Sequence, residues 1–323
     1  MRTRDLTDLL LLAALWGASF LFMRIAAPAF GPIALVEVRV VVAALFLGAL
    51  LALRGQLRAL RGRPAHLAVL GVLNSALPFV LLNYAVLHVT AGFAAILNAT
   101  TPLWTALIGW LWLRNAIRPL QWLGLAIGLA GVVVLVWGKA SFTPSATQVG
   151  TTLALAAALV ATCAYGLSAH YTRRYLDGVP ALVVATGSQL SAAVVLLLPA
   201  LVTWPATPPS ALAWTSAAVL GVACTGLAYL LYFRLLTRIG AVGASAVTFL
   251  IPAFASGWGA LFLDEAVTLQ MIAGGGVILA GTALVLGLWP RRAATQEAPP
   301  SAAQDTAADT PDAAAQAAAR RRG

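Results

Sequence analysis

Long runs of apolar residues, separated by short polar and basic clusters, follow one another from residue 6 to residue 289. Each run is continuous and about 20 residues long, which is the length that an α-helix needs to cross the hydrocarbon core of a bilayer. The pattern therefore predicts ten membrane-spanning helices. Their approximate limits are Leu6–Ala27, Ile33–Leu53, His66–Leu87, Ala91–Leu113, Pro119–Trp137, Gly150–Tyr171, Pro180–Val202, Ala211–Leu235, Ala241–Leu263 and Thr268–Trp289.

Basic residues are distributed unevenly among the connections between these segments. If the N-terminus lies in the cytoplasm, 17 of the 20 Lys and Arg residues fall on the cytoplasmic side, only Lys139 falls outside, and Arg24 and Arg39 lie within spans. This is the positive-inside pattern of membrane proteins. It favours ten spans with both termini in the cytoplasm, because a missed span would reverse the sides of the later clusters. The cytoplasmic set is Arg2, Arg4, Arg54, Arg58, Arg61, Arg63, Arg114, Arg118, Arg173, Arg174, Arg234, Arg238, Arg291, Arg292 and Arg320 to Arg322.

Composition agrees with a chain that resides in lipid. Hydrophobic residues make up 61% of the 323 residues and charged residues only 9%, whereas soluble proteins carry roughly a quarter charged residues. The lipid bilayer is therefore the expected surroundings. The net charge of +10 does not indicate nucleic-acid binding, because the arginines sit at span ends and not on one soluble face.

Motifs for catalysis and for cofactor or metal binding do not occur in the sequence. It has no HExxH, P-loop or GxSxG motif, and its three histidines, at positions 66, 88 and 170, are scattered. Cys163 and Cys224 lie inside apolar segments without a partner at ligand spacing, which favours packing over a zinc site. We therefore expect neither an enzyme nor a cofactor nor a metal site.

The chain contains an internal repeat. A shift of 150 residues overlays the fourth and fifth segments on the ninth and tenth, with 11 identities over the 41 positions from Ala91 to Gly131. Proline and glycine matches carry the most weight, because chance matches of Leu and Ala are common in apolar sequence. These matches include Pro102 with Pro252, Gly109 with Gly259, Gly124 with Gly274 and Gly131 with Gly281.

Each repeat holds five segments, and an odd number turns the second copy upside down in the membrane. The charges follow this inversion: the connection at 54–63 is basic, whereas its counterpart at 203–210 has no charged residue. Inverted repeats of this kind are typical of secondary transporters. The predicted fold class is an all-α polytopic membrane protein with ten transmembrane helices in two inverted five-helix repeats.

The same pattern divides the chain into four parts. Residues 1–137 form the first repeat, 138–149 a periplasmic linker, 150–289 the second repeat, and 290–323 a tail. The tail is a low-complexity sequence of Ala, Asp, Pro and Gln, so we expect it to be disordered and cytoplasmic.

Several blocks resemble a known family. LWGASFLFMRIA with VEVRVVVAAL, LLNYAVLHVTAGFAAILNATTPLWTALIGWLWL, PLQWLGLAIGLAGVVVL and SAVTFLIPAFASGWGALFLDEAVTLQMIAGGGVILAGTALV are similar to the EamA-type transporters of the drug/metabolite transporter superfamily, over about residues 6–289. The resemblance implies a ten-helix inverted-repeat fold, often with a central cavity, and export of amino acids or related metabolites in many bacterial members. One departure is that the family's usual acid at the end of the fourth span is Asn115 here, whereas Glu265 retains it in the second copy.

Polar groups at mid-depth are the candidate substrate-binding residues, because such groups are costly in lipid. Pro102 and Pro252 fall near the middle of the fourth and ninth segments, where a proline breaks the helical ladder and frees carbonyls. Asn98 and Thr248 occupy matching positions on the same faces. The alternative interpretation of each residue is helix packing. The predicted set is Trp16, Ser19, Asn74, Asn98, Thr101, Pro102, Tyr165, Tyr229, Thr248 and Pro252.

Four charged residues are candidates for gating or proton coupling. Arg24, Glu37 and Arg39 lie toward the outer ends of the first two segments, where Arg24 and Glu37 are placed to pair across a short connection. Glu265 is the acid retained in the second repeat. The alternative is that these side chains reach outward to the membrane interface and only orient the hairpin.

Together these patterns predict a secondary transporter of the bacterial inner membrane. It is expected to move a small metabolite, an amino acid or a related compound, by alternating access around a cavity at mid-depth, and the family resemblance implies export. Protons are a candidate coupling ion, and the oligomeric state is left open. The alternative function is a pore-like channel or an uptake permease for small solutes.

Overall fold

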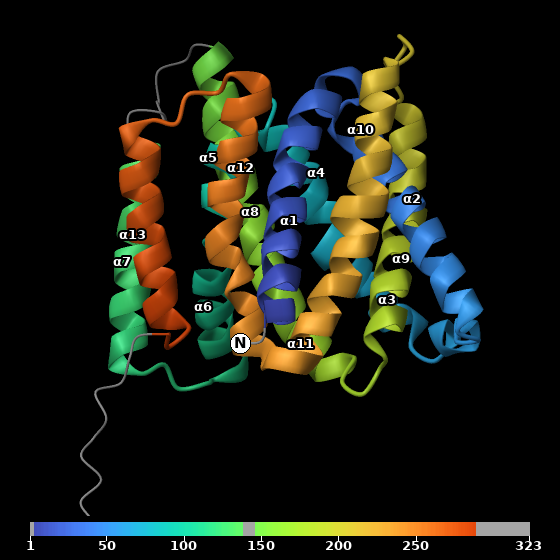
Figure 1. Cartoon of the computed structure of the whole chain (residues 1–323), viewed down its shortest axis with the longest axis horizontal. Helices are drawn as coiled ribbons and strands as arrows, with labels where there is room; N and C mark the ends of the chain where they lie inside the picture. Colours follow the sequence, from blue (N-terminus) through green and yellow to red (C-terminus); the bar gives the residue numbers. More distant parts are fainter. Residues whose placement is uncertain (1–2, 138–145, 289–323) are drawn as a thin grey trace, which may run out of the picture. The chain divides into compact units, whose positions relative to one another are not determined.

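The structure, a computed structural model, describes residues 3–137 and 146–288, which fold almost entirely into helices (Figure 1). In chain order the elements are α1 (Thr3–Phe30), α2 (Pro32–Leu53), the 3₁₀ segment η1 (Leu57–Arg61), α3 (Pro64–Gly71), the π-helical segment η2 (Val72–Ala76), α4 (Leu77–Ala85), α5 (Ala91–Asn98), α6 (Thr101–Leu113), α7 (Pro119–Val136), α8 (Ala146–Tyr175), α9 (Ala181–Val202), α10 (Ala211–Gly221), the π-helical segment η3 (Val222–Leu227), α11 (Ala228–Ser245), α12 (Val247–Leu263) and α13 (Leu269–Val285).

Eight helical stretches of the described residues are long and apolar enough to cross a membrane, and α12 and α13 are shorter apolar helices. The predicted limits need two corrections. The expected break between residues 235 and 241 is absent, because α11 continues to Ser245 and ends just before α12. The expected linker at 138–149 overlaps α8, which begins at Ala146. The expected tail at 290–323 lies outside the described residues.

Local chemistry fixes where the helices begin. Pro32, Pro64 and Pro119 stand in the first turns of α2, α3 and α7, where a missing N–H costs nothing because that donor has no helical partner. Thr90 and Thr268 precede α5 and α13, and their hydroxyl groups accept backbone N–H groups of the first turn. Each side-chain cap of this kind stabilises a helix by roughly 1 kcal/mol.

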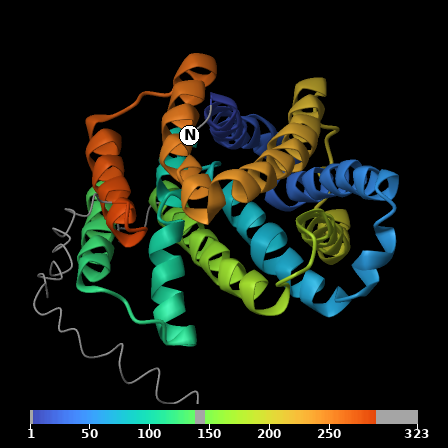
Figure 2. The same cartoon turned by 60° about the horizontal axis from the view of Figure 1, so that its bottom comes forward.

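Helices from the two parts of the sequence pack against each other in pairs. α7 packs along α13, α2 along α9, and α1 along α12. Figure 1 shows α7 and α13 side by side at one edge of this helical body and α2 and α9 at the opposite edge, and Figure 2 shows the same arrangement with the bottom brought forward. Most of the buried apolar side chains lie in one large cluster between them, which includes Leu12, Phe93 and Leu220.

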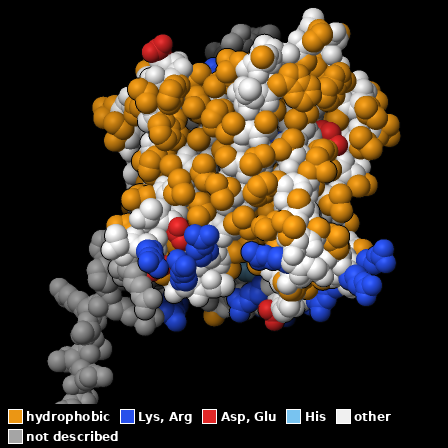
Figure 3. All heavy atoms as spheres, turned by 45° about the vertical axis from the view of Figure 1, so that its right-hand side comes forward, with side chains coloured by type: hydrophobic (Ala, Val, Ile, Leu, Met, Phe, Trp, Pro, Cys, Tyr) orange, Lys and Arg blue, Asp and Glu red, His pale blue; other side chains and the backbone are white. Residues whose placement is uncertain are grey.

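The two ends of the helices differ in charge. Figure 3 shows a broad apolar belt, with Lys and Arg side chains gathered below it. Apolar side chains in the belt face outward, as at Leu45, Leu198 and Leu261, which are 68–70% exposed. Outward-facing leucines are expected where lipid is the solvent. We call the end that holds the connections at 54–63, 114–118 and 173–180 the arginine-rich end, and the other end, with the α12–α13 connection, the arginine-poor end.

An ion-pair cluster at the arginine-rich end joins the start of α1 to α11. Arg238 lies 3.8 Å from a carboxylate oxygen of Asp5 and 3.4 Å from one of Asp8, and Arg234 lies 3.5 Å from Asp8. Both arginines are about half exposed. Exposed pairs contribute little individually, so the cluster orients this helix end more than it stabilises the fold.

Contacts between helices recur after a shift of 150 residues along the chain. Arg39 on α2 donates to Thr225 in η3 at 2.9 Å, and Gln189 on α9 donates to Ser75 in η2 at 2.8 Å. The two π-helical segments are themselves 150 residues apart. With a slip of one residue on the glycine side, Gly17 on α1 packs against Phe254 on α12 and Gly166 on α8 packs against Trp104 on α6.

Candidate functional site

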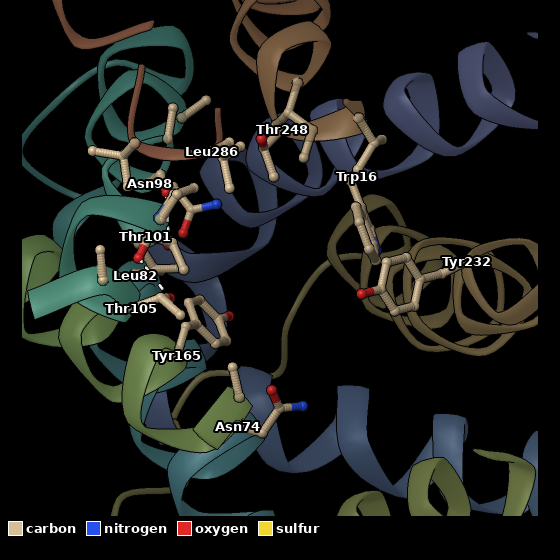
Figure 4. A pocket seen from close by; sticks show the side chains of 18 of the residues that line it. Trp16, Asn74, Leu82, Asn98, Thr101, Thr105, Tyr165, Tyr232, Thr248 and Leu286 are labelled. Atoms are coloured by element: carbon tan, nitrogen blue, oxygen red, sulfur yellow. Dashed lines mark hydrogen bonds between the residues drawn. The ribbon is translucent and has the colours of Figure 1, made fainter. Parts of the chain in front are cut away.

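A cavity of about 710 Å³ lies among the helices. Its walls come from α1, α2, η2, α4, α5, α6, the start of α7, α8, η3, α11, α12 and the end of α13. Nine of the ten residues predicted to bind substrate line it, and they are Trp16, Ser19, Asn74, Asn98, Thr101, Pro102, Tyr165, Tyr229 and Thr248. Figure 4 shows several of them pointing toward a common space from different helices.

Pro252 is the exception, and its placement corrects the sequence prediction. It is buried inside the continuous helix α12 and does not line the cavity. The break in this part of the chain comes earlier, at Ala246 between α11 and α12. Helix α12 thus accommodates its proline without interruption, although Pro252 has no N–H to donate to the carbonyl of Thr248.

The first-half proline does stand beside a helix break. The regular α-helical hydrogen bonding is interrupted between α5 and α6, at Ala99 and Thr100, and Pro102 lies in the first turn of α6. The carbonyl of Asn98 would receive the N–H of residue 102 in an unbroken helix. Here it accepts the hydroxyl of Thr101 at 2.8 Å. This break turns the Asn98 side chain to the cavity, and its Oδ1 is buried without a hydrogen-bond partner among the described residues.

Amide and aromatic groups form the other walls. Asn74 in η2 joins two helices, because its Nδ2 donates to the Tyr229 hydroxyl at 2.9 Å and its Oδ1 accepts the Ser168 hydroxyl at 3.1 Å. Trp16 and Tyr232 face each other across α1 and α11 with ring centroids 5.5 Å apart (Figure 4). Such walls suit a small solute that is partly apolar and partly hydrogen-bonding.

Arg39 lies at the cavity wall, in the half of α2 nearer Pro32. It is only 5% exposed. Its Nε donates to Thr225 Oγ1 at 2.9 Å, its Nη1 lies 3.8 Å from the Met23 sulfur, and its Cζ lies 3.8 Å from the Phe79 ring centroid. No Asp or Glu carboxylate within the described ranges forms an ion pair with it.

Arg24 pairs with Glu265 and not with Glu37, which corrects the expected partner. Arg24 Nε lies 3.3 Å from Glu265 Oε1, and its Nη1 donates to the Val86 carbonyl at 2.6 Å. The second oxygen of Glu265 accepts the Ala91 N–H at the start of α5, at 2.8 Å. We call this set the Arg24–Glu265 latch. It joins α1, the α4–α5 connection and the α12–α13 connection at the arginine-poor end.

Glu37 belongs neither to the cavity wall nor to the Arg24–Glu265 latch. It is 7% exposed and does not line the cavity, and its Oε2 is buried without a hydrogen-bond partner in the described structure. Residues Glu37 and Arg39 are two positions apart on one helix and therefore point to different sides of it. Of the four charged candidates, the structure brings together only Arg24 and Glu265.

The cavity extends to the arginine-rich end. Beyond the mid-depth groups, its lining continues along the α6–α7 corner to Asn115, Ile117 and Gln121, and it includes His170 on α8 and Leu286 after α13. The latch residues at the opposite end are not part of the lining. In this conformation the cavity lining therefore reaches the arginine-rich end and stops short of the latch.

The two corners that follow α6 and α12 have the same backbone geometry but different chemistry. Arg114 and Asp264 both adopt left-handed conformations, with φ of 54° and 53°. The backbone N–H groups of the next residues, Asn115 and Glu265, donate to the carbonyl oxygens of Gly109 and Gly259, each at 3.1 Å. The carboxylate of Glu265 completes the latch, whereas Asn115 lines the open end of the cavity.

Sequence reasoning missed several wall residues, most notably Phe79, Thr225 and Tyr232. Thr225 lies inside η3, where the π-helical turn changes the helical period and with it the face that each residue presents. The available signal was the repeat itself, because a shift of 150 residues takes Asn74, a predicted wall residue, to Cys224 beside Thr225.

A profile of the EamA-like transporter family matches residues 8–137 and 152–287, which together make up most of the chain. The chain belongs to the EamA-like transporter family. This membership shows a multi-pass membrane transporter, and it confirms the resemblance seen in the sequence blocks. It points to a transporter and not to an enzyme.

Individual relatives agree with this family. The chain is 29% identical over 284 residues to the probable terminal-alkyne amino-acid exporter of Streptantibioticus cattleyicolor, covering 86% of this chain and 91% of that protein. It is 28% identical to the uncharacterized transporter YdfC of Bacillus subtilis, covering 84% and 87%. It is 35% identical to the uncharacterized inner membrane transporter YedA of Escherichia coli K12 over 141 residues, which cover 42% of this chain and 45% of that one.

A solved structure, described only as the crystal structure of a protein, supports the fold. It matches with a TM-score of 0.65 at 19% identity and covers 91% of this chain and all of the other. At this level of identity the match bears on the fold alone.

Proposed function

We propose that the protein is a secondary transporter that exports a small metabolite, an amino acid or a related compound, across the bacterial inner membrane. The observation that supports this most strongly is the cavity, whose lining reaches the arginine-rich end and stops short of the Arg24–Glu265 latch at the other end. A carrier needs a site that is reached from one side at a time. A cavity closed at one end by a partly buried, breakable ion pair has that property.

We further propose that two inverted five-helix repeats, residues 1–137 and 150–289, produce the alternation. The recurring contacts support this, because they are reciprocal: Arg39 in the first half contacts Thr225 in the second, and Gln189 in the second contacts Ser75 in the first. Reciprocal contacts are the signature of a two-fold relation between halves. Rocking of one half against the other would then exchange the open and closed ends.

The proposed orientation follows from charge. Clustered arginines at one end of the helices favour a cytoplasmic position for that end. Both termini would then lie in the cytoplasm, and the cavity in this conformation would face the cytoplasm, which is the loading side for an exporter. The relative named as a probable amino-acid exporter supports both the direction and the class of solute. Protons remain a proposed coupling ion, although Glu37 does not line the cavity.

Counterflow in reconstituted vesicles tests this function. Vesicles that contain the protein are loaded with one unlabelled amino acid at a time, and uptake of the same labelled amino acid is followed with and without a proton gradient. We expect transient accumulation of at least one amino acid above empty vesicles, because a carrier exchanges its solute across the membrane. Passive equilibration without accumulation would instead indicate the channel alternative, and no movement of any solute would contradict transport.

A further inference from the structure

Arg39 is the one Lys, Arg, Asp or Glu side chain among the described residues that line the cavity. Only 5% of its surface is exposed, and no carboxylate among the described residues forms an ion pair with it. A buried charge without a counter-ion is expensive, and in a membrane-spanning segment it is rarely present without a functional partner. The proposed transport cycle does not use this charge, so its presence calls for an anion that is not part of the chain.

The neighbours of Arg39 hold its guanidinium group without satisfying it. An arginine carries five N–H donors. Thr225 accepts the Nε donor, and the Met23 sulfur, a weak acceptor, lies near Nη1. The Phe79 ring covers one face of the group. The guanidinium is therefore fixed in orientation, with donors left over at the cavity wall.

We propose that Arg39 binds the carboxylate of the transported solute; this inference rests on the proposed transport function. Arginine presents paired N–H donors that match the two oxygens of a carboxylate. One positive charge suits an anionic group of one negative charge better than a phosphate, which carries more charge and usually meets several basic groups. The solute is thus an amino acid or another monocarboxylate.

The remaining walls suit the rest of an amino acid. The Oδ1 atom of Asn98 is buried and accepts no hydrogen bond from the described residues. It could therefore accept one from the ammonium group of an amino acid. The facing rings of Trp16 and Tyr232 offer an apolar surface to a side chain. Carboxylate recognition by Arg39 would orient the solute between these groups.

The internal repeat supplies a matched control. Gln189 occupies the position that corresponds to Arg39, and it makes the corresponding bond to Ser75, but it carries no charge and does not line the cavity. If loss of a hydrogen bond between a helix and a π-helical segment were enough to impair transport, substitution of either Arg39 or Gln189 would impair it. An effect on carboxylate recognition should appear only at Arg39.

The test compares L-leucine and L-phenylalanine, along with any other amino acid that the counterflow screen identifies, with their carboxamides, which lack the negative charge. Transport and ligand-induced thermal stabilisation are measured for the wild type, Arg39→Gln, Arg39→Lys and Gln189→Met. We expect the wild type to prefer each transported acid over its amide. Arg39→Gln should weaken the apparent affinity for the acid roughly 30-fold or more, as truncation of one partner of a buried charge pair does. Arg39→Lys should retain part of the preference, and Gln189→Met should keep all of it.

A second variant guards against misfolding of Arg39→Gln. Thr225→Val removes the acceptor that positions Nε but keeps the charge of Arg39, so we expect KM for the acid to rise by a larger factor than the maximal rate falls, in protein that size-exclusion chromatography shows to be folded. Equal transport of acids and amides by the wild type, or unchanged affinity in a folded Arg39→Gln protein, would overturn the role of Arg39 and leave transport intact. Failure of the wild type to move any solute would overturn the proposed function itself.

Discussion

Replacement of Gly281 with alanine is expected to destabilise the protein by about 3 kcal/mol. A Cβ atom at this position of α13 would lie 2.4 Å from the Gly128 backbone nitrogen and 2.6 Å from the Gly124 carbonyl oxygen of α7. These are backbone atoms, so no side chain can turn aside to make room. The two helices must separate along their whole contact. Thermal unfolding of the purified protein in detergent, followed by size-exclusion chromatography, measures the loss.

Gly276, on the same helix, is the matched control. A Cβ atom there meets nothing within 4 Å, and alanine has a helix propensity about 1 kcal/mol better than glycine. Gly276→Ala should therefore unfold at the wild-type temperature or slightly above it. Equal unfolding temperatures for the two variants would show that α7 and α13 do not approach as closely as described.

Two features of the fold could be predicted from the sequence, the positions of the spans and the internal repeat. Span positions follow from apolar length, which a bilayer imposes on any helix that crosses it. The repeat was visible because Gly124, Gly131, Gly274 and Gly281 match at a shift of 150 residues, and all four lie where α7 meets α13. A glycine at a backbone contact cannot be replaced freely, whereas the surrounding Leu, Val and Ala can be exchanged for one another.

The residues of the cavity were harder to predict. Asn98 and Thr101 were found because the break before Pro102 is a local consequence of proline chemistry. The helix break predicted at Pro252 was wrong, because α12 remains continuous through its proline, and helix continuity depends on neighbouring helices that a sequence pattern does not show. The π-helical turn at Thr225 altered the helical period on which face assignments depend.

Charge pairing was the least predictable feature. Arg24 has Glu37 near it in the sequence, yet it pairs with Glu265, which lies 241 positions away. The α4–α5 connection decides this choice, because Val86 and Ala91 offer a carbonyl and an N–H that fix both partners. Only the packed structure brings these backbone groups together.

Replacement of Glu265 with glutamine is expected to shift the protein toward opening at the arginine-poor end. Glutamine keeps the shape of the side chain and an oxygen for the Ala91 N–H, but it removes the charge that holds Arg24. Glu265 is only 11% exposed and Arg24 is 33% exposed. Hydrogen bonds to charged groups contribute about 1.5–3 kcal/mol, so we expect the ratio of the two conformations to change roughly 10-fold to 100-fold. The readout is labelling of a cavity cysteine from the arginine-poor side.

Asp264→Asn is the control for the latch. Asp264 is the neighbouring residue, carries the same charge and is exposed. Asparagine tolerates its left-handed conformation, with φ of 53°. This variant should label like the wild type. A matching increase in both variants would assign the effect to net charge at this end, and no increase in Glu265→Gln would remove the latch from the account.

The most direct test of a cavity that opens to one side at a time is sided labelling of a single cysteine. Cys163 and Cys224 are replaced with alanine, because Cys224 lines the cavity, and Thr101→Cys introduces one thiol at mid-depth. A membrane-impermeant maleimide is then applied to inside-out and right-side-out vesicles. We expect rapid labelling from the arginine-rich side, which the proposed orientation places in the cytoplasm, and little labelling from the other side in the absence of solute. Equal labelling from both sides, or from neither, would contradict it.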